Sequence, residues 1–487
     1  MSGIAPQEFL YLVPEIVLAV AGMGLLVAGS FGRGGYRMCT LAAAVALAVT
    51  LLLVFSVQGR VEGPTVVLAG MFVLDGFAFF WKILFLISSI LVVILSERFL
   101  NDGGYRPGEF YALILLATTG MMLMVSGFNL LSIWVSLELM ALSSYVLAGF
   151  FKHERKSNEA ALKYFVLGAL SSGILLYGIS LLYGATGTIQ LTVLASRLPD
   201  TAVLAQEAPL AAIGWLLLAI GLFFKVAAVP FHVWTPDVYE GAPTPVTAFL
   251  ASSSKAASFA IMVRIFYQGM PSLKPDWQWA VAGVAIITMV WGNLAALTQQ
   301  NVKRMLAYSS IAHAGYVLIG VLVATEEALW ALLFYLFAYS FMTLGAFGTV
   351  ILLERREYAA ETYSDYAGLA QRSPLLAAMM LIFMLALTGI PPTGGFFGKI
   401  YLFGAAIESG WIWVALAGVL TSAISLYYYM GIVVQMYFKA PADQSPLPLE
   451  APGLTGAVAV CAIVTVLLGI LPETLVEFAK SSLIALP

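Results

Sequence analysis

Apolar stretches of about twenty residues recur from one end of this 487-residue sequence to the other, and a helix of that length matches the hydrocarbon thickness of a bilayer. Hydrophobic residues make up 61% of the chain and charged residues only 10%. An average soluble domain has roughly 25% charged residues. Lipid is therefore expected to be the main solvent. Backbone groups in lipid must be satisfied within the protein, and no ten-residue alternation predicts a barrel, so the stretches are expected to be helices.

Hydropathy windows predict about fourteen transmembrane helices, which makes the fold an all-α polytopic membrane protein. They lie near residues 9–29, 38–57, 74–96, 110–126, 128–150, 159–184, 209–240, 243–266, 276–297, 304–323, 327–353, 373–409, 411–437 and 452–472. We expect one integral membrane domain over 1–487, divided into three N-terminal helices (1–109), two groups of five helices (110–270 and 271–440) and a C-terminal helix (441–487).

Two of these spans are too long for one straight crossing. The span 209–240 contains Pro230 and Pro236, and the span 373–409 contains Pro391, Pro392, Gly394 and Gly395. Both are expected to be broken helices. Each is the fourth span of its group of five, and the two groups begin on opposite sides of the membrane, which is the pattern of an inverted repeat. Discontinuous helices at matching positions indicate an ion site near the midplane, although proline kinks accommodated by packing remain the alternative.

The distribution of basic residues predicts the orientation. Alternate loops hold thirteen Lys and Arg residues on one side and five on the other, with Arg264 among the five. The positive-inside rule assigns the richer side to the cytoplasm. Both termini are then expected on the outer side of the membrane, away from the cytoplasm. The first apolar stretch lacks a basic lead-in and a cleavage motif, so it is expected to be retained.

Five ionisable residues within the two repeats are costly to place in lipid and need a reason. Glu138 and Lys255 lie near the centres of their spans, too deep for their charges to reach water. Lys225 precedes the Pro230 break and Lys399 follows the Gly394-Gly395 break, where irregular backbone must line a polar cavity. Lys163 lies about one turn from the cytoplasmic end, where a lysine side chain can also simply reach the surface.

These residues are the predicted proton-transfer groups. Burial favours the neutral form of a lysine and a neighbouring carboxylate favours the charged form, so changing the distance from a lysine to Glu138 would change its protonation. A static ion-pair network is the alternative, but one carboxylate cannot neutralise four lysines. His232 and His313 are candidate proton relays, and each could equally be a packed histidine. Asp75 and Lys82, seven residues apart on the third span, form a further pair whose role stays open between function and structure.

Several function classes lack support in the sequence. The net charge of −3 argues against a nucleic-acid-binding protein. Cys39 and Cys461 are far apart, and the three histidines are scattered, so no metal, haem or iron-sulfur ligand set is expected. No glycine fingerprint follows a strand-like run, so no dinucleotide cofactor is expected on this chain.

Four motifs resemble the antiporter-like membrane subunits of bacterial NADH-quinone oxidoreductase, respiratory complex I, and among them the subunit N family. They are the stretch around PDVYEGAPTP within 221–259, NEAALKYFVLGALSSG at 158–173, LAYSSIAHAGY at 306–316 and GIPPTGGFFGKIYLF at 389–403. The resemblance covers essentially the whole chain. It assigns proton transfer to Glu138, Lys163, Lys225, Lys255 and Lys399, with no departure from the family pattern at these five positions.

The resemblance implies a proton channel driven by quinone reduction elsewhere in the complex. NADH, FMN, iron-sulfur clusters and quinone are then expected on partner subunits, and none of these cofactors on this chain. The expected neighbours are K-like and M-like membrane subunits, together with lipid. The enzyme activity would belong to the assembly, a proton-pumping translocase.

Three other functions remain open at this point. A subunit of a cation/proton antiporter or of a membrane-bound hydrogenase would share the broken helices and the lysines. An autonomous solute transporter would need a substrate-sized pocket at the two breaks. A structural membrane scaffold would tolerate neutralisation of the lysines.

Overall fold

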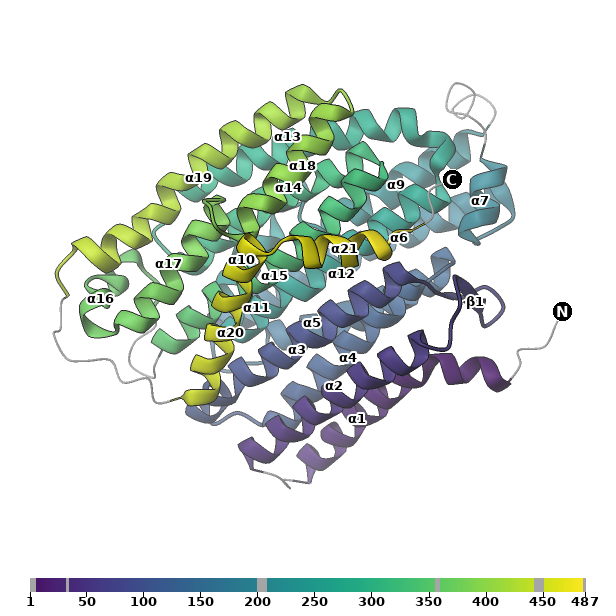
Figure 1. The fold of residues 1–487 in the computed structure, drawn as a ribbon. Coiled ribbons are helices and arrows are strands. Elements are labelled where there is room, and N and C mark those ends of the chain that lie inside the picture. Colours follow the sequence, from purple (N-terminus) through teal and green to yellow (C-terminus); the bar gives the residue numbers. More distant parts are fainter. Residues whose placement is uncertain (1–5, 32–34, 199–207, 355–359, 442–450, 485–487) are drawn as a thin grey trace.

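The computed structural model describes residues 6–31, 35–198, 208–354, 360–441 and 451–484. Arg33, Arg355 and Arg356, which the sequence assigns to the cytoplasmic side, lie outside the described residues, as do the terminal residues themselves. Helices dominate the described chain (Figure 1).

Twelve helical segments of the described chain are long and apolar enough to cross a membrane. Eleven of them contain one main helix each: α1 (Val13–Ser30), α2 (Tyr36–Gln58), α3 (Gly76–Gly103), α4 (Pro107–Ser126), α5 (Leu130–Ala148), α6 (Arg155–Thr186), α13 (Lys274–Leu297), α14 (Val302–Val323), α15 (Glu326–Leu353), α19 (Ile412–Phe438) and α20 (Pro452–Ile470). The twelfth, Thr244–Gly269, is composite. Two shorter apolar helices, Pro209–Lys225 and Pro374–Thr388, begin the two spans predicted to be broken, so the predicted all-α membrane fold is confirmed.

Both predicted breaks are present. The first span consists of α9 (Pro209–Lys225) and α10 (Trp234–Gly241), and the second consists of α17 (Pro374–Thr388) and α18 (Gly394–Glu408). Gly395 shows why the second break uses glycine, because a Cβ atom at this position would lie 1.9 Å from the carbonyl oxygen of Ala386. The end of α17 and the start of α18 therefore approach each other too closely for any side chain.

The composite span Thr244–Gly269 changes its hydrogen-bonding pattern three times. It begins as α11 (Thr244–Phe249), passes through the π-helix η2 (Leu250–Ser254), continues as α12 (Lys255–Arg264) and ends in a second π-helix, η3 (Ile265–Gly269). π-Helical turns inside α-helices are rare and frequent at functional sites. Lys255 is the first residue after the first of them.

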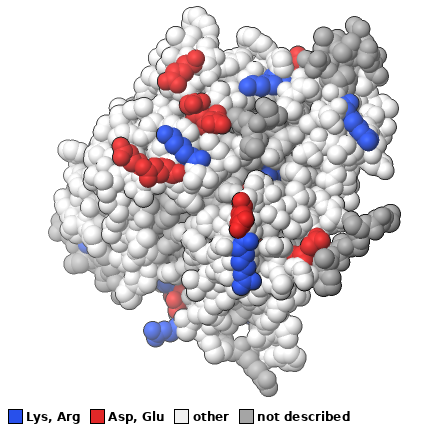
Figure 2. Space-filling model, turned by 45° about the vertical axis from the view of Figure 1, so that its right-hand side comes forward, with Lys and Arg blue, Asp and Glu red and all other residues white. Residues whose placement is uncertain are grey.

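The helices run roughly side by side, with α1, α2 and α4 near one edge and α13 and α19 near the opposite edge (Figure 1). The centre of the bundle consists of the composite span, α14 and α15. In each of them, 94% or more of the most apolar 18-residue stretch is buried. By contrast, α1, α2 and α19 expose much of their apolar surface. Figure 2 shows a face on which few charged residues interrupt an uncharged surface, as lipid contact requires.

Short elements cap the bundle. A hairpin of β1 (Thr65–Val67) and β2 (Phe72–Leu74), which hydropathy did not predict, pairs antiparallel with Thr65 opposite Leu74. The first described segment, η1 (Pro6–Leu12), contacts this hairpin through a hydrogen bond from the Leu68 amide to Glu8. The end of α21 (Glu473–Ser481) packs at Gly76, directly after the hairpin. The first and last described segments therefore lie on the same side. The other short elements are α7 (Leu191–Arg197), η4 (Pro271–Leu273), η5 (Tyr363–Tyr366) and α16 (Leu369–Arg372).

Asp75 and Lys82, whose roles the sequence left open, bind different partners. Asp75 binds Arg264 in a bidentate salt bridge, with Nη1 to Oδ2 and Nη2 to Oδ1 both 2.9 Å. Lys82 pairs with Glu15 of α1 at 2.7 Å. Arg264 therefore does not lie in an outer loop, because it belongs to α12 and is 0% exposed. The two pairs tie α3 to α12 and to α1. The proposed division of the chain at residues 109, 270 and 440 stays a prediction.

Candidate functional site

Lys255 begins one polar cluster in the centre of the bundle. Its side chain is 3% exposed. Its Nζ atom donates to the carbonyl oxygen of Ser310 at 2.7 Å and also contacts the Ser310 hydroxyl. The Ser310 carbonyl oxygen has two lone pairs, so it can accept from Lys255 and still take part in the hydrogen bonds of helix α14. Lys255 is thus held by neutral groups of α14.

His313 lies one turn further along α14. Its Nδ1 atom lies 2.6 Å from the hydroxyl of Tyr335 on α15, and its Nε2 atom lies 3.1 Å from the hydroxyl of Tyr429 on α19. Tyr429 in turn contacts the hydroxyl of Ser309. A neutral imidazole donates through one nitrogen and accepts through the other, so both bonds can form at once and can exchange direction when the tautomer changes. His313 therefore bridges three helices through groups that can relay protons.

Lys399 lies at the second break. Its Nζ atom donates to the carbonyl oxygens of Leu387 and Thr388 at 3.0 and 2.7 Å. It also lies 2.7 Å from the Ser422 hydroxyl of α19. These two carbonyls belong to the last turn of α17, where carbonyl groups lack partners within the helix and carry the negative end of its dipole. The break thus provides a binding site for an ammonium group without any carboxylate.

Helix α14 connects the two lysines. Ser310, His313 and Tyr316 follow one another at three-residue spacing, so they lie on one face of the helix. The ammonium of Lys399 lies over the Tyr316 ring, 5.0 Å from its centroid. Lys255 and Lys399 both act electrostatically on the His313 ring. From Ser310 to Tyr316 the helix rises about 9 Å, so one face of α14 connects Lys255 to Lys399 through His313.

Glu138 and Lys225 form a second cluster around Tyr145 of α5. The Lys225 Nζ atom lies 3.4 Å from the Tyr145 hydroxyl, and the Glu138 charge acts on Lys225 through space. Glu138 itself is half-buried and accepts from the hydroxyl of Ser172 on α6, which also accepts from the Trp134 indole at 3.0 Å. Glu138 and Lys225 therefore interact without forming a contact ion pair. Helix α9, which ends at Lys225, packs against α12, which begins at Lys255.

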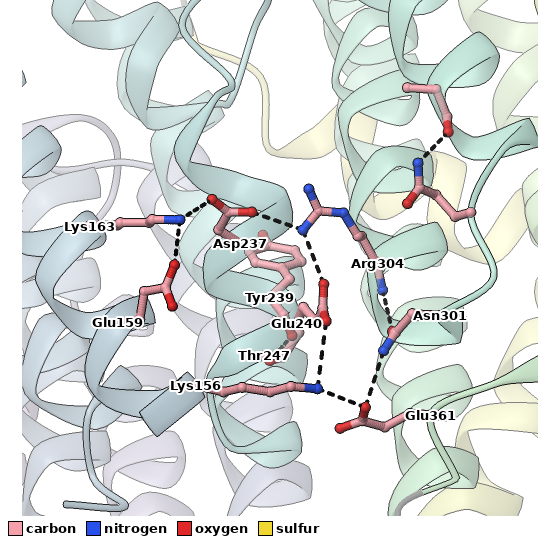
Figure 3. Close-up of polar contacts among 12 residues, drawn as sticks. Lys156, Glu159, Lys163, Asp237, Tyr239, Glu240, Thr247, Asn301, Arg304 and Glu361 are labelled. Atoms are coloured by element: carbon pink, nitrogen blue, oxygen red, sulfur yellow. Dashed lines mark hydrogen bonds and ion pairs between the residues drawn. The ribbon is translucent and has the colours of Figure 1, made fainter. Parts of the chain in front are cut away.

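Lys163 belongs to a different group of charges. Its Nζ atom lies 2.6 Å from Asp237 of α10 and 2.8 Å from Glu159 of α6 (Figure 3). Its side chain is 40% exposed, so it does reach the surface. Asp237 also pairs with Arg304 of α14 at 2.8 Å.

The network of ion pairs continues from Arg304 through a second carboxylate of α10. Arg304 pairs with Glu240 at 3.0 Å, Glu240 lies 3.7 Å from Lys156, and Lys156 pairs with Glu361 at 2.9 Å (Figure 3). These pairs connect α6, α10 and α14. The second half of the first broken helix is thus fixed by charges on both of its neighbours.

His232 is placed apart from the other candidates. It lies within the first break and is 8% exposed. Its Nδ1 atom is buried and makes no hydrogen bond of normal geometry among the described residues, although the Pro230 backbone interacts with the ring. The ring lies 6.2 Å from Trp291. An unsatisfied nitrogen at irregular backbone is a suitable site for a bound water.

The sequence did not predict the serine and tyrosine side chains that contact the candidate lysines and His313. Ser310 and Tyr316 occur with His313 in the motif LAYSSIAHAGY, and their helical spacing was visible there. Tyr145, Tyr335 and Tyr429 lie on other helices, and no local pattern distinguishes them from membrane-embedded aromatics. Within the described residues, no group of three or more His, Cys, Asp or Glu could hold a metal ion.

A family model described as "NADH:quinone oxidoreductase/Mrp antiporter, TM" matches residues 127–425, which include both broken helices and all seven candidate residues. The chain belongs to this family. It is 43% identical over 475 residues to NADH-quinone oxidoreductase subunit N of Trichlorobacter lovleyi, covering 97% of this chain and 96% of that protein. It is 41% identical to NADH-quinone oxidoreductase subunit N 2 of Rhizobium meliloti, covering 98% of both. The resemblance to subunit N of bacterial complex I is therefore confirmed.

Solved structures agree with this assignment. A chain of respiratory complex I from Thermus thermophilus with bound aureothin superposes with a TM-score of 0.79 at 35% identity, over 96% of this chain and 99% of that one. A chain of the Mrp complex from a Dietzia species superposes with a TM-score of 0.85 at 23% identity, over 98% of this chain and 97% of that one. The second likeness shows the fold alone. The chain is accordingly an antiporter-like membrane subunit of the complex I type, whose relatives are subunits of an oxidoreductase complex.

Proposed function

We propose that this chain translocates protons across the bacterial inner membrane as the subunit N of an NADH-quinone oxidoreductase, through Glu138, Lys225, Lys255, His313 and Lys399. The observation that carries the proposal is the polar face of α14, where Ser310, His313 and Tyr316 connect the ammonium of Lys255 to that of Lys399. Buried ionisable residues in membrane helices usually serve proton or ion paths.

The partners of the lysines favour proton transfer over a static ion-pair network. Lys225, Lys255 and Lys399 are at most 9% exposed, and their hydrogen bonds go to hydroxyls and carbonyl groups. No ion pair among the described residues includes any of them. A buried lysine without a contact carboxylate has the lowest cost when neutral, and the proton it releases can pass to the neighbouring hydroxyl or imidazole.

Lys163 takes a different role in this proposal. Asp237 and Glu159 hold it in the charged form on the cytoplasmic side. Release of Lys163 from Asp237 towards Glu138 would bring a positive charge to the first cluster, which favours loss of a proton from Lys225. Lys163 would thus control the path, and His232 would bind water at the first break.

The chain supplies no redox chemistry in this proposal. NADH, FMN, the iron-sulfur clusters and quinone are placed on other subunits of the assembly, and quinone reduction there drives the change at Glu138 and Lys163. The neighbours within the membrane are proposed to be K-like and M-like subunits, with both termini on the periplasmic side. Identity above 40% to subunits named NADH-quinone oxidoreductase favours this assembly over an antiporter or a hydrogenase.

The test measures proton uptake and NADH oxidation together in vesicles that contain the whole complex. Glu138→Ala and Lys225→Ala should each lower quinone-linked proton transfer about ten-fold or more, because positioned proton-transfer groups contribute about 10²–10⁴-fold. Lys152→Ala, which removes an exposed lysine, serves as the control. Lys163→Ala should cost less if the Lys163 side chain only reaches the surface, and about as much as Lys225→Ala if Lys163 controls the path. Normal proton-to-electron ratios in assembled Glu138→Ala and Lys225→Ala complexes would refute the proposal and support a scaffold.

A further inference from the structure

A cavity of about 340 Å³ opens where the end of α15 meets the α3–α4 turn and the α5–α6 loop. At about 30 Å³ per water it has room for about ten molecules. Its polar lining consists of Arg98, Asp102, Tyr105, Glu154 and Glu354. Arg98 and Asp102 pair with each other at 3.3 Å. The positive-inside rule places this face at the cytoplasm, because the flanking loops hold Arg106 and Lys152.

Glu354 is the least exposed carboxylate of this cavity, since Asp102 is 44% exposed and Glu154 is also exposed. It follows α15 directly, and its Oε1 atom accepts from the Thr244 hydroxyl at 2.7 Å. Its Oε2 atom is buried and has no hydrogen-bond partner among the described residues. A buried carboxylate oxygen without a partner is costly, whereas a carboxyl group that carries a proton there and donates it to a water is not.

Its surroundings make this carboxyl group titrate near neutrality. Burial raises the pKa of Glu354 to about 7, and the charges of Glu361 and Glu154 act in the same direction. The charge of Lys303 and the Thr244 hydrogen bond lower the pKa of Glu354, but do not outweigh burial. Glu354 would thus change from mostly protonated to mostly ionised as the pH rises through neutrality.

Thr244 begins the segment that leads from Glu354 to Lys255. Lys255 lies eleven residues further along the chain, about 16 Å at 1.5 Å per residue. Hydroxyl side chains recur along this segment, all at most 6% exposed: Thr244, Thr247, Ser252, Ser253 and Ser254. The Ser253 hydroxyl has no partner among the described residues. Such a group can bind a water, and hydroxyls and waters together can pass a proton.

We propose that Glu354 takes up protons from cytoplasmic water in this cavity and passes them along the hydroxyl-lined segment from Thr244 to Lys255. The proposal rests on the proton conduction proposed above. In each cycle an O–H bond forms between the Glu354 carboxylate and a proton from a hydronium ion of the cavity. That bond breaks when the proton passes to a water beside Thr244, which restores the carboxylate.

A structural role for Glu354 is the competing explanation. Lys303 of α14 is 5% exposed and donates to the carbonyl oxygen of Ala242 at 2.9 Å, and the Glu354 charge stabilises it. A carboxylate that only balances Lys303 would remain ionised from pH 6 to 8. Its loss would lower assembly without changing the pH profile of proton transfer.

The test compares Glu354→Gln with wild type from pH 6 to 8, using the whole complex in vesicles with proton uptake and NADH oxidation as readouts. Glu354→Gln should lower proton uptake at least five-fold and abolish the one-proton step near pH 7. Glu109→Gln, which removes a carboxylate beside Arg106 on the same face, should keep the wild-type rate and profile. An assembled Glu354→Gln complex with normal uptake and an unchanged pH profile would overturn the proposal.

Two further measurements keep the outcomes distinct. Infrared difference spectra of the purified complex between pH 6 and 8 should contain a carboxylic C=O band that is absent in Glu354→Gln. If Glu354→Gln does not assemble, the band should be shifted in Glu354→Asp. Absence of the band in the wild-type complex overturns the proposal. Loss of uptake in Lys225→Ala with normal uptake in Glu354→Gln would refute only the role of Glu354. Normal uptake in both variants would refute the proposed conduction path itself.

Discussion

The salt bridge between Asp75 and Arg264 offers a quantitative test of how the fold is held together. Arg264 is 0% exposed, and both of its terminal nitrogens bind the Asp75 carboxylate at 2.9 Å. Asp75 also caps α3, since its Oδ1 atom accepts from the Ala78 amide at 2.8 Å. The substitution Asp75→Asn keeps the size and the capping ability of the side chain but removes its charge.

The expected cost follows from the burial of the partner. Removing one member of a buried ion pair typically costs about 3 to 5 kcal/mol, because the remaining charge is uncompensated. Asp75→Ala should cost about 1 kcal/mol more, because the helix cap is lost as well. Replacing both members by neutral groups, in Asp75→Asn with Arg264→Met, should recover most of the loss, since buried pairs replaced by apolar residues are often neutral in stability.

The assay is equilibrium unfolding of the chain by SDS in mixed detergent micelles, followed by helix content. Glu109→Gln is the matched control, because it breaks the ion pair between Glu109 and Arg106 at the surface. The Arg106 side chain is 70% exposed. Such surface pairs contribute about 0 to 1 kcal/mol. If Asp75→Asn unfolds at the same SDS concentration as Glu109→Gln, or if the double variant is less stable than Asp75→Asn, the pair does not contribute as its burial indicates.

Two further predictions concern the second repeat. His313→Phe approximately preserves the volume but removes the bonds to Tyr335 and Tyr429, so proton uptake by the assembled complex should fall about as far as in Lys225→Ala. Uptake at the level of the control Lys152→Ala would contradict a relay at His313. Gly395→Ala should lower the amount of assembled complex, because its Cβ would lie 1.9 Å from the Ala386 oxygen. In Gly404→Ala, on the same helix, the new Cβ meets nothing within 4 Å, so this variant should assemble normally. Equal assembly of the two variants would refute the close approach.

The sequence was sufficient for the features that depend on local chemistry. Proline and glycine located both helix breaks, because these residues cannot continue a regular helix. Hydropathy located the spans, because twenty apolar residues leave few alternatives. The positions of Lys225 and Lys399 beside the breaks followed from the same patterns, and the structure places both lysines there.

Contacts between distant segments could not be predicted in the same way. Glu15 and Lys82 are 67 residues apart, and Asp75 and Arg264 are 189 residues apart. Hydropathy windows average over single charges, so they placed Arg264 at a span end and ignored Glu15. The tyrosines around His313 come from α15 and α19, and only the packing of those helices brings them together. Lys163 pairs with Asp237 for the same reason.

The π-helix η2 makes the length of its segment as important as its residue types. A π-helical turn includes one residue more than an α-helical turn, and one residue corresponds to about 100° of rotation around a helix axis. If Leu250–Ser254 became a regular α-helix with the same number of residues, Lys255 would point about 100° away from Ser310, whereas deleting one residue at the same time would keep its direction. Homologous chains that conserve this contact should therefore either keep the π-helical turn or replace it with a regular turn that is one residue shorter, whatever residues take the place of the serines.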